Sequence, residues 1–225
     1  EEEISTTVNL IKFDGPNQVQ SEALKQLDIA RNTHNQNKGL VVMATGLGKT
    51  ILAALDVIAI KPEKILLDKS INNKESIEII KSYKPDLLIS ILGNQIFKNE
   101  IINLAPKGCI NLHTALLPKY RGLMPTFWVM KNDEKYTGVS VFYVNEGIDT
   151  GPIIVQKKVE IGNRTQEELI KHTKMIGMKS IVEAVEIIDI GNVETLENNN
   201  EDQTYFSFPK KEDVAIFKKR NKKFF

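Results

Sequence analysis

An amide, an imidazole and a carboxylate stand in this chain where they could act together on a carbonyl group. Asn111 and His113 flank one leucine at the end of an apolar run, and Asp149 lies in a later Glu-Gly-Ile-Asp-Thr-Gly segment. The amide can donate to a tetrahedral oxyanion, the imidazole can manage the proton of an attacking amine, and the carboxylate can orient the imidazole. These residue types suit the transfer of an acyl group to an amine.

The elements that would position these residues alternate between strands and helices. Apolar and β-rich runs predict strands at residues 39–43, 64–67, 85–91, 108–113, 137–144 and 153–161. Helical spacing and capping residues predict helices at 18–35, 49–60, 73–83, 95–104 and 165–190, the last opening on a Thr165/Glu168 capping box. This alternation favours an α/β fold whose mainly parallel, Rossmann-like sheet is flanked by helices.

A strand over 108–113 places Asn111 and His113 on the same side of the sheet, because side chains alternate with a period of two. Both would lie at the carboxyl end of the strand, where ligands bind in open α/β sheets. The glycines at 147 and 151 would let the backbone around Asp149 approach a ligand closely. We expect the strand over 137–144 to deliver this loop to the same edge of the sheet.

Four segments resemble the catalytic core of the formyltransferases that use 10-formyltetrahydrofolate. They are Pro85-Asp-Leu-Leu-Ile-Ser, Gly108-Cys-Ile-Asn-Leu-His113, Leu117-Pro-Lys-Tyr-Arg-Gly122 and Glu146-Gly-Ile-Asp-Thr-Gly-Pro-Ile-Ile. The resemblance runs from about Asp68 to about Ile190, and more loosely to the end of the chain. It implies an α/β fold of formyltransferase type and an enzyme that moves a formyl group from 10-formyltetrahydrofolate, as cosubstrate, to an amine.

The resemblance also implies a role for individual residues. Asn111, His113 and Asp149 would be catalytic: the first on the oxyanion, the second as base or charged stabiliser, and the third orienting the imidazole. The folate would bind at Ile91, Leu92, Gly93, Gly147, Ile148 and Thr150. The loop with Tyr120, Arg121 and Gly122 would face the formyl acceptor. This chemistry requires no metal, and the sequence offers no cluster of metal ligands.

The acceptor is left open. The tail that begins Thr204-Tyr-Phe-Ser-Phe-Pro resembles those of shorter formyltransferases, of which the enzymes acting on nucleotide-linked amino sugars are the nearest small-acceptor class. Its aromatic residues are expected to cover the core. A core like that of methionyl-tRNA formyltransferase is an alternative. Because residues 191–225 are too short for the C-terminal β-barrel of those enzymes, we expect a small-molecule amine rather than tRNA.

A second motif lies upstream, where Gly46-Leu-Gly48-Lys49-Thr50 stands between an apolar strand segment and a helical one. Residues 8–62 resemble the phosphate-loop region of superfamily 2 helicases. Backbone N–H groups would surround a phosphate, Lys49 would reach the terminal phosphates and Thr50 would bind Mg²⁺. The paired acids and the arginine-bearing lobe that hydrolysis needs have no counterpart, so a bound nucleotide without turnover is the most that we expect.

Together the two resemblances predict a fused chain. Residues 1–63 would be a helicase-like fragment that supplies an atypical N-terminal βαβ segment, in place of the usual first half of the sheet. Residues 64–205 would be the catalytic core and 206–225 a basic C-terminal tail. An ATP-binding helicase fragment and an inactive fusion remnant stay open as alternatives.

Composition excludes several classes of protein. A net charge of +1 does not favour nucleic acid as a partner, and no apolar stretch is long enough to span a bilayer. A lone cysteine and the lack of a recognisable signal peptide suit the reducing cytoplasm. The chain opens on glutamate rather than methionine, which is typical of a processed, trimmed or partial sequence. The oligomeric state does not follow from the sequence.

Overall fold

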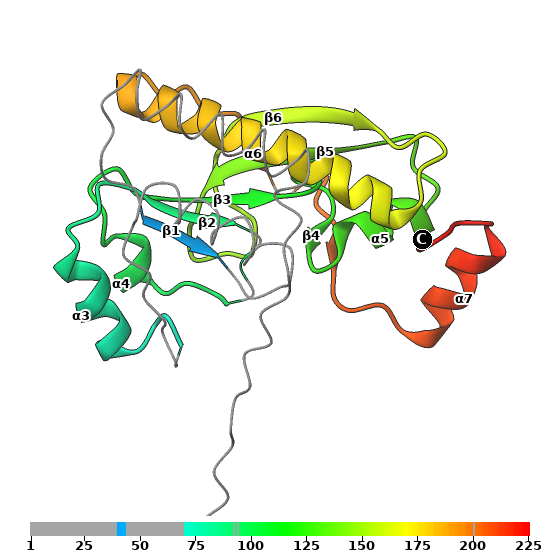
Figure 1. Ribbon diagram of the computed structural model, residues 1–225, viewed down its shortest axis with the longest axis horizontal. Coiled ribbons are helices and arrows are strands. Elements are labelled where there is room, and N and C mark those ends of the chain that lie inside the picture. The colour runs from blue at the N-terminus through cyan, green and yellow to red at the C-terminus, as the bar shows by residue number, and fades with distance from the viewer. Residues whose placement is uncertain (1–39, 44–69, 92, 94, 200) are drawn as a thin grey trace, which may run out of the picture.

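The computed structural model describes residues 40–43, 70–91, 93, 95–199 and 201–225 (Figure 1). Its elements are, in chain order, β1 (Leu40–Met43), α3 (Lys74–Ser82), β2 (Leu88–Ile91), α4 (Asn99–Ile102), β3 (Cys109–His113), β4 (Arg121–Gly122), α5 (Pro125–Lys131), β5 (Tyr136–Tyr143), β6 (Ile153–Glu160), α6 (Gln166–Ile190), β7 (Tyr205–Phe206) and α7 (Lys211–Lys219). The helices and strands predicted at 18–35, 49–60 and 64–67 lie outside the described residues.

The main sheet has the strand order β1-β2-β3-β5-β6 and combines two kinds of pairing. β1, β2 and β3 are parallel, whereas β5 is antiparallel to both β3 and β6. β1 lies beside β2, with Leu40 opposite Leu88. β5 and β6 follow one another through a loop with no crossover helix between them, so these two strands pair antiparallel.

β3 separates two apolar layers. Ile110 and Leu112 pack toward α6, which lies along one face of the sheet (Figure 1). The alternate residue Cys109 packs on the other face, with residues of α3 and α4. Asn111 and His113 therefore share the face opposite α6, as the period of two predicts. The close approach of α6 depends on Gly177, where a Cβ atom would lie 2.6 Å from Leu112 Cδ2.

The capping residues predicted for two helices are confirmed. Asn73 caps α3 through the N–H of Ser76, and the Thr165/Glu168 capping box opens α6. The helix predicted at 95–104 is shorter than expected, since α4 covers only Asn99–Ile102. The residues before it are held in another conformation by side-chain bonds to the 70–72 segment, including Gln95 Oε1 with the N–H of Ile71 at 2.9 Å.

The C-terminal residues pack into the protein. β7 pairs in parallel with β4, and Phe217 of α7 is fully buried, with its ring 5.0 Å from that of Phe127. The boundary predicted after residue 205 falls inside β7. Phe206 covers the core as expected, whereas Tyr205 and Phe208 are exposed. Within the described part of the chain, no helix is both long and apolar enough to cross a membrane.

Candidate active site

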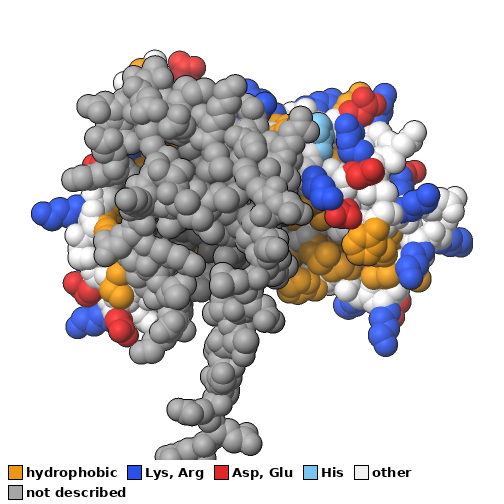
Figure 2. Space-filling model, in the orientation of Figure 1, with side chains coloured by type: hydrophobic (Ala, Val, Ile, Leu, Met, Phe, Trp, Pro, Cys, Tyr) orange, Lys and Arg blue, Asp and Glu red, His pale blue; other side chains and the backbone are white. Residues whose placement is uncertain are grey.

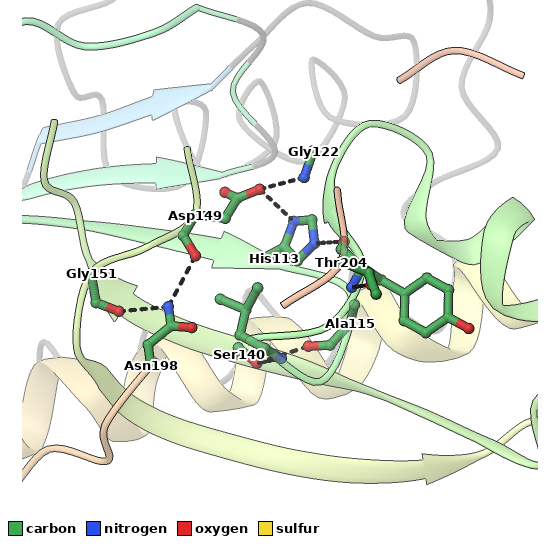
Figure 3. Close-up of polar contacts among 10 residues, drawn as sticks. His113, Ala115, Gly122, Ser140, Asp149, Gly151, Asn198 and Thr204 are labelled. Carbon is green, nitrogen blue, oxygen red and sulfur yellow. Dashed lines mark hydrogen bonds and ion pairs between the residues drawn. The ribbon is translucent and has the colours of Figure 1, made fainter. Parts of the chain in front are cut away.

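His113 is the last residue of β3, and each of its ring nitrogens faces a neighbouring oxygen atom. Nε2 lies 2.7 Å from the backbone oxygen of Tyr120 (Figure 3). A carbonyl can only accept, so Nε2 carries a hydrogen and the neutral ring presents a bare Nδ1. Nδ1 lies 3.7 Å from Asp149 Oδ2, and the imidazole is only 8% exposed. The basic atom of His113 therefore faces the carboxylate.

Asp149 is held in an uncommon backbone conformation. Its φ of 53° lies in the left-handed region, which non-glycine residues rarely adopt. Its Oδ2 also accepts a hydrogen bond from the N–H of Gly122 at 2.8 Å (Figure 3). Gly122 itself has a φ of 91°, and a Cβ atom there would lie 2.3 Å from the Phe206 carbonyl oxygen. The carboxylate thus joins His113 to the backbone of the loop that contains Gly122.

The route of the 145–151 loop differs from the one predicted. β5 runs antiparallel to β3, and the N–H of Val144 donates to the carbonyl of Cys109 at 2.7 Å. The carboxyl end of β5 therefore lies beside the start of β3, so the prediction that this strand ends at the same edge as His113 is wrong. The loop itself covers the distance. The predicted proximity of Asp149 to His113 is confirmed.

Asn111 contributes an amide on the same face as His113. Its Oδ1 is buried and has no hydrogen-bond partner among the described residues. A buried acceptor without a partner costs about 1–3 kcal/mol, so such an atom is suited to receive a ligand hydrogen. An amide also has two donor hydrogens. Asn111 can therefore accept from an attacking amine with Oδ1 and donate to an oxyanion with Nδ2.

One segment predicted to bind folate begins at the carboxyl end of the parallel strands, and the stretch after it contacts the loop that contains the other. Ile91 pairs with Leu112 of β3, which places the end of β2 beside the end of β3. Asn99 Nδ2 donates to Glu146 Oε1, which links the stretch after β2 to the 145–151 loop. In that loop Ile148 is 41% exposed. Leu92 lies outside the described residues.

Small residues shape both predicted folate segments. A Cβ atom on Gly93 would lie 2.7 Å from Ser90 Oγ, and one on Gly147 would lie 2.1 Å from Thr150 Oγ1. Thr150 Oγ1 donates to Asn145 Oδ1 at 2.6 Å, and this bond fixes the loop internally. In both segments the glycine allows a turn that a Cβ atom would obstruct.

The loop predicted to face the acceptor turns its side chains inward. Tyr120 stacks on Phe206 and donates its hydroxyl to Glu134 at 2.7 Å, and burial raises its pKa to about 12. Arg121 is 2% exposed. Burial lowers the pKa of Arg121, while the charge of Asp149 acts in the opposite direction. Gly122 meets Asp149 through its backbone, so this loop shapes the site mainly through main-chain groups.

Two residues that support the site belong to none of the motifs found in the sequence. Ser140 of β5 donates to the carbonyl of Ala115 at 2.7 Å and so fixes the turn that follows His113 (Figure 3). Asn198 donates to the carbonyls of Asp149 and Gly151. Its segment is acidic and Asn-rich, which favours a solvated linker. The only signal was the run of asparagines at 198–200.

The phosphate-loop residues Gly46, Gly48, Lys49 and Thr50 lie outside the described residues. Among the residues that the structure describes, no group of three or more His, Cys, Asp or Glu side chains could hold a metal ion. The site as described consists of Asn111, His113 and Asp149 with the loops around them.

Residues 18–185 match the family model described as formyl transferase, and the chain belongs to this family. Curated relatives include the methionyl-tRNA formyltransferase of Kosmotoga olearia, 34% identical over 149 residues, which are 66% of this chain and 48% of that protein. The methionyl-tRNA formyltransferase of Clostridioides difficile is 41% identical over 136 residues, which are 59% of this chain and 43% of that protein. The chain spans about half the length of the curated relatives that it matches.

Solved structures confirm the α/β fold of formyltransferase type. A sugar N-formyltransferase from Shewanella has a TM-score of 0.65 at 20% identity, and the match covers 91% of this chain and 84% of that one. Glycinamide ribonucleotide transformylase 1 from Symbiobacterium toebii has a TM-score of 0.65 at 21% identity, covering 80% and 86%. An N-formyltransferase from Helicobacter canadensis, in complex with folinic acid and dTDP-3-aminofucose, has a TM-score of 0.58 at 23% identity. That match covers 84% of this chain and 67% of the other.

Proposed function

We propose that this chain transfers a formyl group from 10-formyltetrahydrofolate to the amine of a small or nucleotide-linked acceptor, such as an amino sugar. The observation that carries the proposal is the arrangement of three side chains from two segments: Asn111 and His113 lie on the same face of β3, and His113 Nδ1 is 3.7 Å from Asp149. Membership of the formyl transferase family supports the reaction class.

The geometry suggests how the three groups divide the reaction. The acceptor nitrogen attacks the formyl carbon, and Asn111 Nδ2 donates to the oxygen that becomes negative. The amine proton passes to His113 Nδ1, whose charged form is stabilised by Asp149. The bond from the carbon to N10 then breaks and N10 takes up a proton, which leaves a formamide and tetrahydrofolate. Asp149 keeps its charge throughout.

Exposed apolar side chains support an acceptor that carries a ring. Leu123, Met124, Tyr205 and Phe208 are all exposed, and they follow or belong to β4 and β7. Figure 2 shows hydrophobic atoms gathered in this part of the face. The backbone of Gly122, which contacts Asp149, begins this stretch. A nucleobase stacked on an exposed aromatic side chain here would suit a nucleotide-linked amine.

An acceptor panel tests the proposal. The purified chain is incubated with 10-formyltetrahydrofolate and, separately, with nucleotide-linked amino sugars, free amino sugars and methionyl-tRNA. Gain of one formyl group, followed by mass spectrometry or by aminoacyl-ester analysis, identifies the acceptor. Turnover confined to methionyl-tRNA would favour the alternative acceptor class, which the curated relatives' names suggest. Absence of transfer to every acceptor would favour an inactive remnant.

Folate binding through the 145–151 loop predicts a specific effect at Ile148. Replacing this 41% exposed residue by aspartate should raise the Kd for tetrahydrofolate by about tenfold or more, because an apolar contact becomes a charge that must be desolvated. Isothermal titration calorimetry provides the measurement. Ile216→Asp is the matched control, since Ile216 of α7 is also 41% exposed. Equal affinities in the two variants would place the pterin elsewhere.

The helicase-like character of residues 8–62 stays a separate prediction, and the formyl transferase match overlaps it from residue 18 onward. We expect no ATP hydrolysis in a phosphate-release assay with or without DNA or RNA, because the acids and arginines for phosphoryl transfer have no counterpart. Lys49→Ala should leave formyl transfer unchanged beyond any effect on stability. Steady ATP turnover that Lys49→Ala abolishes would make the helicase-like function primary.

A further inference from the structure

A segment remote in sequence runs beside the loop that carries Asp149. After α6, Leu196 forms an antiparallel bridge with Ile153, and the two N–H···O distances are 3.0 and 2.7 Å. This bridge brings the residues that follow Leu196 alongside the end of the 145–151 loop. Asn198 lies there and is only 8% exposed. A buried amide needs partners for its donors and its acceptor, so its contacts are informative.

The amide of Asn198 is bonded at both ends. Its Nδ2 donates to the carbonyl of Asp149 at 2.9 Å and to that of Gly151 at 2.8 Å, which uses both hydrogens (Figure 3). Its Oδ1 accepts from Arg121 Nη2 at 2.9 Å. Arg121 Nη2 also lies 3.1 Å from the Asn198 backbone oxygen. The side chain therefore ties two carbonyls of the loop to a buried guanidinium.

These bonds act on the backbone of Asp149, whose position determines where its carboxylate lies. Asp149 has a left-handed φ of 53°, and such a conformation persists when surrounding contacts enforce it. Its carboxylate must reach both the N–H of Gly122 at 2.8 Å and His113 Nδ1 at 3.7 Å. A shift of the main chain at Asp149 would move the carboxylate away from the imidazole by a similar amount.

We propose that Asn198 is a positioning residue, whose two amide hydrogens hold the Asp149 backbone where the carboxylate faces His113. Its kinetic consequence rests on the proposed function. Its structural consequence, the placement of Asp149 beside His113, holds in the protein without substrate. The two consequences can therefore be measured separately.

Steady-state kinetics test the first consequence. Asn198→Ala removes both donors, and Asn198→Asp keeps an oxygen for Arg121 but places another oxygen against two carbonyls. Both should lower kcat by about ten- to a hundredfold, with a smaller change in KM for the folate, as expected for misplacement by a fraction of an ångström. Asn199→Ala is the matched control. Asn199 accepts from Arg121 through its backbone oxygen, at 3.2 Å, and the substitution keeps this oxygen. The Asn199→Ala variant should therefore retain wild-type kcat.

Imidazole NMR tests the second consequence in the ligand-free protein. The His113 ring resonances are assigned by their loss in His113→Gln, and Asp149→Asn shows where they move when the carboxylate is neutralised. Asn198→Ala should move them in the same direction and Asn199→Ala should not. If Asn198→Ala does not fold, Asn198→Ser, which retains one donor, replaces it and should move them less.

The outcomes separate the two proposals. Wild-type His113 resonances in Asn198→Ala and Asn198→Asp would overturn the positioning role, whatever the activity. A shifted His113 together with an unchanged kcat would overturn its kinetic part. Absence of formyl transfer in the wild-type chain, or wild-type rates in Asp149→Asn, would overturn the proposed function instead.

Discussion

Replacing His113 by glutamine, or Asp149 by asparagine, is expected to lower kcat for formyl transfer by about 10²–10⁴-fold while the protein remains folded. His113 Nε2 is bonded to the Tyr120 carbonyl, which leaves Nδ1 as the atom that can take the amine proton. That atom faces Asp149 Oδ2 at 3.7 Å. Without the carboxylate charge, the protonated ring loses the group that stabilises it.

Both substitutions are chosen to preserve the structure around the site. Glutamine can still donate to the Tyr120 carbonyl, so that no buried acceptor is stranded when the imidazole is removed. Asparagine can still accept from the N–H of Gly122 through its remaining oxygen. Circular dichroism and melting temperature check the fold. His172→Gln, on α6, is the matched control for the histidine and should retain wild-type kcat.

The double variant distinguishes a shared step from two independent ones. If Asp149 acts through His113, then His113→Gln with Asp149→Asn should be little slower than His113→Gln alone. Multiplicative losses in the double variant would show that Asp149 acts on the reaction by another route. Wild-type turnover in either single variant, with an accepted substrate, would remove these residues from the mechanism.

The local geometry of the site followed from the sequence wherever it depended on short spacing. Asn111 and His113 lie on one face because one residue separates them within β3, and this needs only the period of a strand. The capping box of α6 was likewise visible as Thr165 and Glu168. Such features are decided by residues within one or a few positions of each other, so a single sequence contains the information.

The long-range part could not be derived in this way. Whether β5 runs parallel or antiparallel to β3 depends on tertiary packing, and the periodicity of the sequence does not indicate it. The route predicted for the Asp149 loop was therefore wrong. Asn198 acts 49 residues from Asp149 and lies in a stretch with the composition of a linker. The resemblance to formyltransferases supplied the candidate catalytic residues, but it did not reveal the long-range contacts around them.

The second large effect is expected at Asn111. Asn111→Ala should lower kcat by about 10²–10³-fold, the usual loss when one oxyanion donor is removed. The negative oxygen exists only in the transition state, so KM for the folate and for the acceptor should change little. Asn111→Asp should be at least as slow, because it replaces the donors by a charge that repels the oxyanion. Single-turnover formyl transfer with a saturating acceptor provides the measurement.

Stability gives this prediction an independent control. Asn111 Oδ1 has no hydrogen-bond partner among the described residues, so its removal leaves no donor there without an acceptor. The melting temperature of Asn111→Ala should therefore be close to that of the wild type. Thr137 Oγ1 is a second buried oxygen without a described partner, on β5. Thr137→Val should keep both the fold and wild-type kcat. If Asn111→Ala turned over within a few-fold of the wild type, a backbone N–H of the surrounding loops would have to supply the oxyanion donor instead.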